Sequence, residues 1–240
     1  MKRLLLFLAL LGIPAPARAQ VNWTLETSVW SSFVLADLGI KAYRRPGIQT
    51  SLTAAFQNGC SFNIWDWRAF SRNYGKNYSE VDYTVGCVAT LGPVKLNTSI
   101  SYYDLPMQFK SLGDVVQGIV GVSVPFINGA HTVTPYLNLK PTFPLGFKEG
   151  LYTEFGVTDA VKLNAQWTFV FGGRIVNDTG IYGNTAGWNA RGDATAIYAV
   201  TKSLDWKVGV RVFQPITHFD GPLDYRVREV VGWSGVAYRF

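Results

Sequence analysis

The sequence predicts an all-β protein, a transmembrane antiparallel meander β-barrel of about twelve strands, with roughly ten to fourteen as the range. One observation is a membrane-like composition, because 48% of the 240 residues are hydrophobic and only 16% are charged. After the first 13 residues, however, no apolar run approaches the ~20 residues that a membrane-spanning helix needs. Apolar and polar residues instead alternate with a period of two, and short and long connections alternate along the chain. Both patterns are typical of barrel strands joined by short turns at one rim and long loops at the other.

The N-terminus has the pattern of an export signal. Lys2-Arg3 precedes an apolar stretch over 4–13, and Ala17-Arg18-Ala19 forms a small-x-small cleavage site. We therefore expect a signal peptide over 1–19 and a transmembrane β-barrel over 20–240. Removing the three bases of the signal leaves 19 of the 22 bases and all 16 acids, so the formal net charge falls from +6 to +3. This small charge excludes a nucleic-acid partner.

Alternation defines the strands. Over 94–103, for example, apolar and polar residues alternate, which gives a strand one apolar and one polar face. Pro135 lies inside one such segment. Because proline removes a ladder hydrogen bond, a closed sheet tolerates it only at a bulge or a strand end. We expect strands over 24–35, 48–57, 60–70, 79–91, 94–104, 114–124, 131–140, 150–158, 162–173, 194–201, 205–213 and 229–240.

The connections give the barrel its orientation. An exported barrel has short turns on the periplasmic side and long loops on the extracellular side. Aromatic residues near the strand ends, Trp65 and Trp67 among them, predict two girdles at the membrane interfaces. We expect short turns at Asn58-Gly59, Gly92-Pro93, 126–130, 159–161 and 202–204. We expect long loops over 36–47, 71–78, 105–113, 141–149, 174–193 and 214–228.

The C-terminal strand carries Val236, Tyr238 and the terminal Phe240 on one face. This ending resembles the C-terminal signature of bacterial outer-membrane β-barrels, which the outer-membrane assembly machinery reads. The first half, with Arg44-Arg45-Pro46-Gly47 and the Asn58-Gly59 hairpin, resembles the small porins of the TorF type. The resemblance implies residence in the outer membrane of a Gram-negative bacterium, with its lipid bilayer as a partner. It also implies transport of small polar solutes by passive diffusion.

The polar face of each strand is expected to line the lumen. Six bases against four acids give this wall a mild positive bias, which predicts a weak preference for anions caused chiefly by Lys95, Lys207 and Arg211. The expected pore-lining bases are Lys95, Lys140, Arg174, Lys207, Arg211 and Arg239. The expected pore-lining acids are Glu26, Glu80, Asp82 and Glu154.

An alternative is that these charges pair across a narrow, plugged lumen, as Lys95 could with Glu80 or Asp82 on the neighbouring strand. A barrel of about twelve strands lies between small filled barrels and wide porins, so both outcomes are compatible with the strand number. The longest predicted loop, 174–193, either folds inward as a constriction or stays outside.

Cys60 opens one predicted strand and Cys87 lies near the end of the next, on the same face. In an exported chain this favours a disulfide near the periplasmic rim, with two lipid-facing thiols as the alternative. No CxxC or HExxH motif and no phosphate-binding glycine loop is present, so we expect no metal and no cofactor.

Two other classes of function compete with the pore. An outer-membrane lipid hydrolase would have to use His131 or His218, and neither has a serine nearby in the sequence, so we expect no enzyme. A non-conducting structural or adhesion barrel would bind a partner through loop aromatics. These aromatics are Tyr43, Tyr74, Tyr78, Tyr182 and Trp188. The oligomeric state and the solute do not follow from the sequence.

Overall fold

The computed structural model describes residues 21–35, 40–43, 45–70, 79–104, 114–145, 148–181, 186–217 and 228–240. The predicted signal peptide, His218, Tyr74, Tyr78 and Tyr182 lie outside the described residues. Among those described, no helix is long and apolar enough to cross a membrane.

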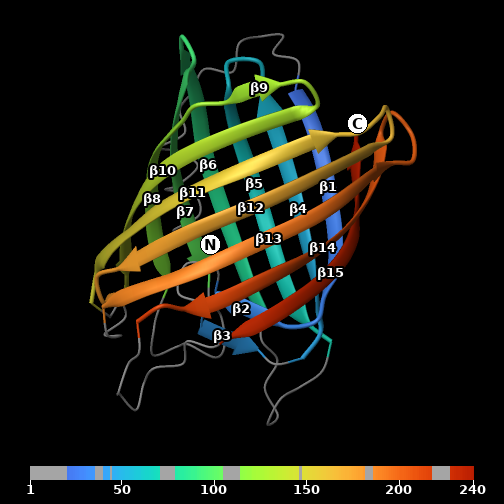
Figure 1. Ribbon diagram of the computed structural model, residues 1–240. Coiled ribbons are helices and arrows are strands. Elements are labelled where there is room, and N and C mark those ends of the chain that lie inside the picture. The colour runs from blue at the N-terminus through green and yellow to red at the C-terminus, as the bar shows by residue number, and fades with distance from the viewer. Residues whose placement is uncertain are drawn as a thin grey trace.

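The chain forms a closed antiparallel barrel of 12 strands, as predicted (Figure 1). Each wall strand pairs with its neighbours in chain order, and the ring closes where β1 pairs with β15. The wall strands are β1 (Val21–Trp30), β4 (Gly47–Phe56), β5 (Cys60–Ala69), β6 (Ser79–Leu91), β7 (Val94–Asp104), β8 (Val115–Ser123) continued by β9 (Phe126–Asn128), β10 (His131–Pro144), β11 (Gly150–Lys162), β12 (Trp167–Asp178), β13 (Gly187–Ala199), β14 (Leu204–Pro215) and β15 (Glu229–Arg239).

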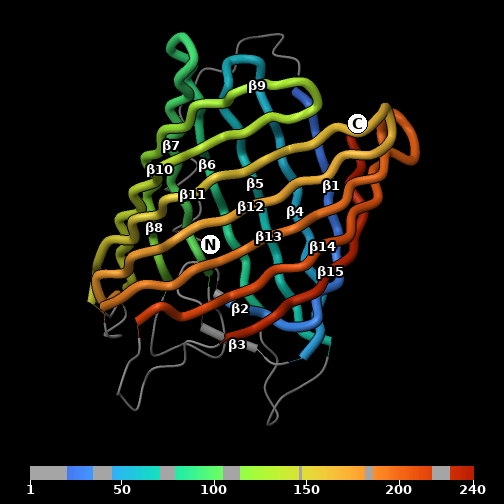
Figure 2. The backbone as a smooth tube through the Cα atoms, viewed as in Figure 1, coloured from blue at the N-terminus to red at the C-terminus, as the bar shows by residue number. Residues whose placement is uncertain are grey.

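Tight turns gather at one rim of the barrel (Figure 2), and the opposite rim, where β5, β7, β12 and β14 end, is called the long-loop rim. At the tight-turn rim Gly59, Gly92 and Gly129 have φ of 83°, 61° and 59°, a left-handed region that glycine adopts without a side-chain clash. The long-loop rim carries a hairpin that the sequence did not predict. It consists of β2 (Phe33–Leu35) and β3 (Ile40–Tyr43).

Pro135 lies at a break in the sheet. The partner of β10 changes from β9 to β8 at this position, and the Val124 N–H donates to the Pro135 carbonyl at 3.2 Å. β8 and β9 are thus one wall strand that is interrupted opposite the proline. The structure confirms that proline in this closed sheet is accommodated at an irregularity.

Several predicted connections have the wrong bounds. β9 occupies the start of the turn expected over 126–130, and β10 extends to Pro144, into the loop expected over 141–149. The turn expected over 159–161 lies at 163–166, because the Asn164 side chain accepts hydrogen bonds from the N–H groups of Gln166 and Trp167 at 2.9 and 2.8 Å. The loop expected over 174–193 is wrong at both ends, because β12 continues to Asp178 and β13 begins at Gly187.

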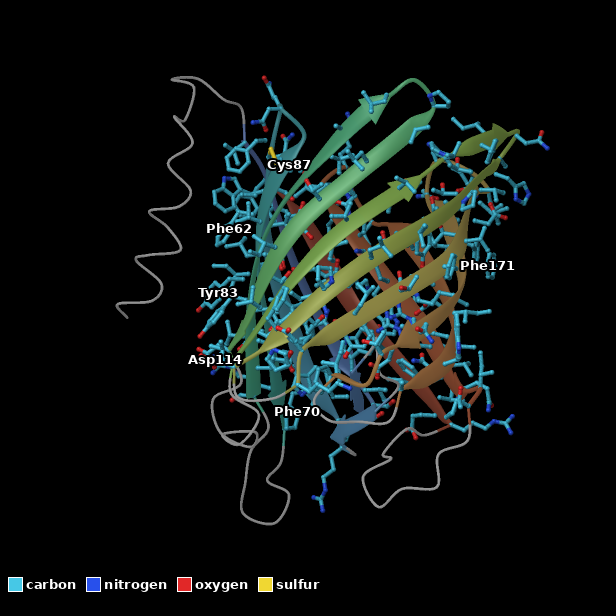
Figure 3. The ribbon with its side chains drawn as sticks, turned by 90° about the vertical axis from the view of Figure 1, so that its left-hand side faces the viewer. Phe62, Phe70, Tyr83, Cys87, Asp114 and Phe171 are labelled. Atoms are coloured by element: carbon cyan, nitrogen blue, oxygen red, sulfur yellow. A yellow bond between two sulfur atoms is a disulfide. The ribbon has the colours of Figure 1, made fainter. Side chains whose placement is uncertain are left out.

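The apolar face of the wall points outward and the polar face inward. Figure 3 shows Phe62, Tyr83 and Phe171 projecting from the outside of the barrel. The girdle prediction, which also included Phe33 and Tyr103, is wrong for these two residues and for Trp65 and Trp67. Trp65 and Trp67 pair with the inward-facing Ser51 and Gln49 and therefore share the inner face. Phe33 packs in the inner cluster, and Tyr103 pairs with the inward-facing Asp82. A hydrophobic cluster consequently lies inside the barrel near the long-loop rim. It consists of Trp30, Val34, Trp67, Phe213 and Val231, with Phe33, Trp65, Ala69 and Trp233 packed against it.

Candidate functional site

A connected network of charges occupies the inner wall from β10 to β14. Lys140 Nζ lies 2.9 Å and Arg174 Nη1 lies 3.1 Å from the same Glu154 carboxylate oxygen. Arg174 Nη2 extends to Asp193 at 3.5 Å. Asp193 also accepts from Arg191 Nε at 2.8 Å and from Arg211 Nε at 2.6 Å. Four bases thus surround two carboxylates, so this cationic network carries two excess positive charges.

The network lies on consecutive strands because of the sheet register. Arg174 is the cross-strand partner of Arg191, and Asp193 is the partner of Arg211. Two like charges directly opposite one another on neighbouring strands are unfavourable unless a carboxylate compensates them. Here the Asp193 carboxylate approaches both Arg174 and Arg191. Glu154 is fully buried, and ion pairs shielded from water in this way have one preferred geometry rather than many.

The remaining predicted bases lie closer to the tight-turn rim. Lys207 Nζ pairs with Glu26 at 2.5 Å, and Arg239 pairs with Asp205 at 2.5 Å. Lys95 is exposed, and within the described part of the chain it has no ion-pair partner.

The suggested pairing of Lys95 with Glu80 or Asp82 is wrong. The partner of Lys95 on β6 is Thr90, whereas Asp82 pairs with Tyr103 at the other end of the strand. Eight residues of strand, about 27 Å at 3.4 Å each, separate the two levels. Glu80 and Asp82 lie on the inner face beside Trp67 and Trp65 instead, near the long-loop rim.

Further charges face inward that sequence reasoning did not assign to the lumen. They are the bases Lys162 and Arg191 and the acids Asp178, Asp193, Asp205 and Glu229. Bases and acids therefore balance over the described inner face, so the electrostatic asymmetry lies in their positions rather than in their total. The positive excess is concentrated in the network on β10–β14, whereas Glu80 and Asp82 make β6 acidic.

Neutral polar groups line the wall between these charged regions. Asn63 donates to the hydroxyl oxygens of Ser51 and Thr53 at 2.7 and 2.8 Å. Gln117 donates to the hydroxyl of Thr142 at 2.9 Å. Such side chains bind water or polar solutes equally well, which is the expected chemistry of a hydrated lumen.

The segment after β1 folds into the barrel at the long-loop rim. The Phe33 ring stacks on Trp67 with 4.8 Å between centroids, and Val34 is buried in the same cluster. This segment therefore places apolar side chains inside the barrel at the long-loop rim. Ile181, just after β12, is also fully buried, and it packs over the inner face of Gly150.

The cationic network touches this hydrophobic cluster. Arg211 Cζ lies 5.0 Å from the Trp30 ring centroid, and Trp30 stacks on Trp233 at 5.3 Å. A guanidinium over an indole face is a stabilising cation–π contact.

The other predicted sites lie on the outer face. Cys60 and Cys87 are direct cross-strand partners joined by a disulfide, and Figure 3 shows Cys87 near the tight-turn rim. Val236, Tyr238 and Phe240 point outward together, with Tyr238 and Phe240 stacked at 5.8 Å.

Two residues of the competing hypotheses also lie outside. His131 pairs with Asp159 at 2.8 Å on the outer face of the tight-turn rim, away from the lumen. Trp188 lies on the outer face of β13 and not in a loop, so it is unsuited to an extracellular binding loop.

Comparison with known proteins gives the fold. No protein-family model and no curated protein matches the chain. Solved structures do: the NanC porin has a TM-score of 0.59 at 11% identity, covering 90% of this chain and 98% of that one. The KdgM porin has a TM-score of 0.57 at 11% identity, covering 91% and 99%. The COG4313 outer membrane channel from Pseudomonas putida F1 has a TM-score of 0.61 at 9% identity, covering 95% and 98%.

The chain therefore has the fold of bacterial outer-membrane β-barrels. The translocator domain of the autotransporter NalP from Neisseria meningitidis also resembles it, with a TM-score of 0.54 at 13% identity, covering 100% of this chain and 95% of that one. One fold thus serves different functions, so function has to be argued from the inner wall.

Proposed function

We propose that the protein is an outer-membrane channel for passive diffusion of small polar solutes, with a modest preference for anions. The observation that carries this proposal is the cationic network, four bases around the buried Glu154 and the half-buried Asp193 on the inner face of β10–β14. An inner wall built only for stability would be apolar and tightly packed, because replacing buried ion pairs by hydrophobic residues is often neutral or stabilising. The similarity to porins agrees with a channel.

The size of the preference follows from Coulomb's law. A unit charge about 10 Å from the barrel axis interacts with a monovalent ion by about 0.4 kcal/mol in water. Two excess charges give about 0.8 kcal/mol, which screening at ~0.1 M salt lowers to about 0.3 kcal/mol. Beside the network anions gain this energy and cations lose it, so the expected ratio of anion to cation permeability is at most about three. The acidic Glu80 and Asp82 on β6 oppose this effect.

The experiment is a planar bilayer measurement on the purified barrel under a roughly tenfold KCl gradient. We expect discrete conductance steps, with the sign of the reversal potential reporting preferential chloride flow. Absence of steps at any salt concentration contradicts the channel and favours the plugged barrel. Steps with a cation-selective reversal potential contradict the anion preference alone.

A further inference from the structure

Aromatic rings on the inner wall lie flat over glycines of the neighbouring strand. A Cβ at Gly156 would lie 2.3 Å from both Cζ and Oη of Tyr136, its cross-strand partner. A Cβ at Gly209 would lie 2.5 Å from Nε1 of Trp233, again the cross-strand partner. Real Cβ contacts are not this short, so any other residue at either glycine forces the ring away from the wall.

Glycines on the outer face of the adjacent strands β12, β13 and β15 behave differently. A Cβ at Gly173, Gly192 or Gly232 would meet nothing within 4 Å. Glycine weakens a strand interior, so a glycine retained beneath an aromatic ring has a steric reason that these outer glycines lack. The chain therefore provides its own matched controls.

The Gly156–Tyr136 pair lies at the cationic network. Gly156 is the cross-strand partner of Arg174, and Glu154 precedes it by two residues on the same face. The Tyr136 ring therefore lies on the wall where the proposed channel carries its excess positive charge. A Cβ on the inner face of Gly156 would push this ring away from the wall, which is towards the lumen.

We infer that Gly156 and Gly209 set the free width of the lumen by letting Tyr136 and Trp233 lie against the wall. This inference rests on the proposed channel and adds the residues that determine its size selectivity. A Cβ at Gly156 requires the phenol to move by at least about 1.2 Å to reach an ordinary contact of ~3.5 Å. The ring end of tyrosine moves by side-chain rotation, so the barrel is expected to remain folded while its lumen narrows.

The test compares single-channel conductance of four proteins: wild type, Gly156→Ala, Gly192→Ala and the double variant Gly156→Ala/Tyr136→Ala. We expect Gly156→Ala to lower the conductance by about 1.5-fold, because a ring tilted off the wall blocks part of the cross-section. Gly192→Ala should equal wild type. The double variant should conduct at least as well as wild type, because the obstructing ring is gone. Gly209→Ala repeats the test at Trp233.

The outcomes separate this inference from the proposed function. If wild type conducts and Gly156→Ala has the same conductance, the inference is overturned and the proposed channel stands. An equal loss in Gly156→Ala and in the double variant also overturns it, because the loss then does not act through Tyr136. A wild-type barrel that does not conduct overturns the channel and the inference together. Melting of each variant in detergent verifies that it is folded.

Discussion

Asp193 holds the cationic network together, and its replacement by asparagine is the most informative single change. The carboxylate approaches three guanidinium groups, at 2.6 Å from Arg211, 2.8 Å from Arg191 and 3.5 Å from Arg174. Asparagine has nearly the same shape but no charge. Asp193→Asn therefore leaves the packing intact and removes the negative charge between the three bases.

The expected loss of stability follows from these contacts. Hydrogen bonds to charged groups contribute about 1.5–3 kcal/mol each, and two of the three contacts are within hydrogen-bonding distance. Arg174 keeps its pair with Glu154, so it loses little. We expect the free energy of unfolding to fall by about 3 kcal/mol. The added positive charge should raise the ratio of anion to cation permeability by about 1.7-fold.

The matched control is Asp205→Asn on the adjacent strand. Asp205 pairs with Arg239, whose side chain is 48% exposed, so water replaces part of the lost interaction and the loss of unfolding free energy should be smaller than in Asp193→Asn. Urea titration of the barrel in lipid vesicles, followed by tryptophan fluorescence, measures both values. Equal losses in the two variants, or a shift of Asp193→Asn towards cation preference, would refute the reasoning.

Three further predictions concern the outer face, the inner cluster and one turn. Because the disulfide closes a loop with a sequence separation of 27, replacing Cys60 and Cys87 by serine should lower the unfolding free energy by about 3 kcal/mol. Titration of the denatured, unreduced protein should detect no thiol, and two free thiols would contradict the bond. Trp67→Ala should lower the free energy of unfolding in vesicles by about 3–5 kcal/mol and raise the conductance, because the buried ring holds Phe33 inside the barrel. A conductance equal to wild type would show that the segment containing Phe33 does not narrow the lumen. Asn164→Ala should lower the free energy of unfolding, measured by urea titration, by about 1 kcal/mol, because two backbone N–H groups lose their acceptor. An unchanged unfolding free energy would show that the turn does not depend on this side chain.

The sequence predicted the barrel well wherever apolar residues marked the outer face. The bounds of β6 and β7 agree with the expected 79–91 and 94–104, because alternation is strong there and Gly92-Pro93 marks the turn. The opposite case is the start of β13. Its outer face carries small residues such as Ala190 and Gly192, so the contrast between faces is weak and the segment resembles a loop.

That weak contrast also concealed part of the site. Arg191 and Asp193 fell inside the predicted loop and were not assigned to the lumen, although they alternate with small residues as inner-face residues do. Alternation also cannot distinguish the inner from the outer face of a strand where the inner face itself carries aromatic residues. Trp65 and Trp67 were therefore placed in the girdle, whereas the register puts them inside. Long-range register similarly decides which charges meet, and no local pattern encodes it.

The central claim is that the network on β10–β14 gives the channel its charge preference. The direct measurement is the reversal potential of wild type against the double variant Lys140→Met/Arg191→Gln, which removes the two excess charges while Glu154 keeps Arg174 and Asp193 keeps Arg211. Wild type should show an anion-selective potential, and the double variant should lose this anion selectivity. A potential that is unchanged by the double substitution would contradict it.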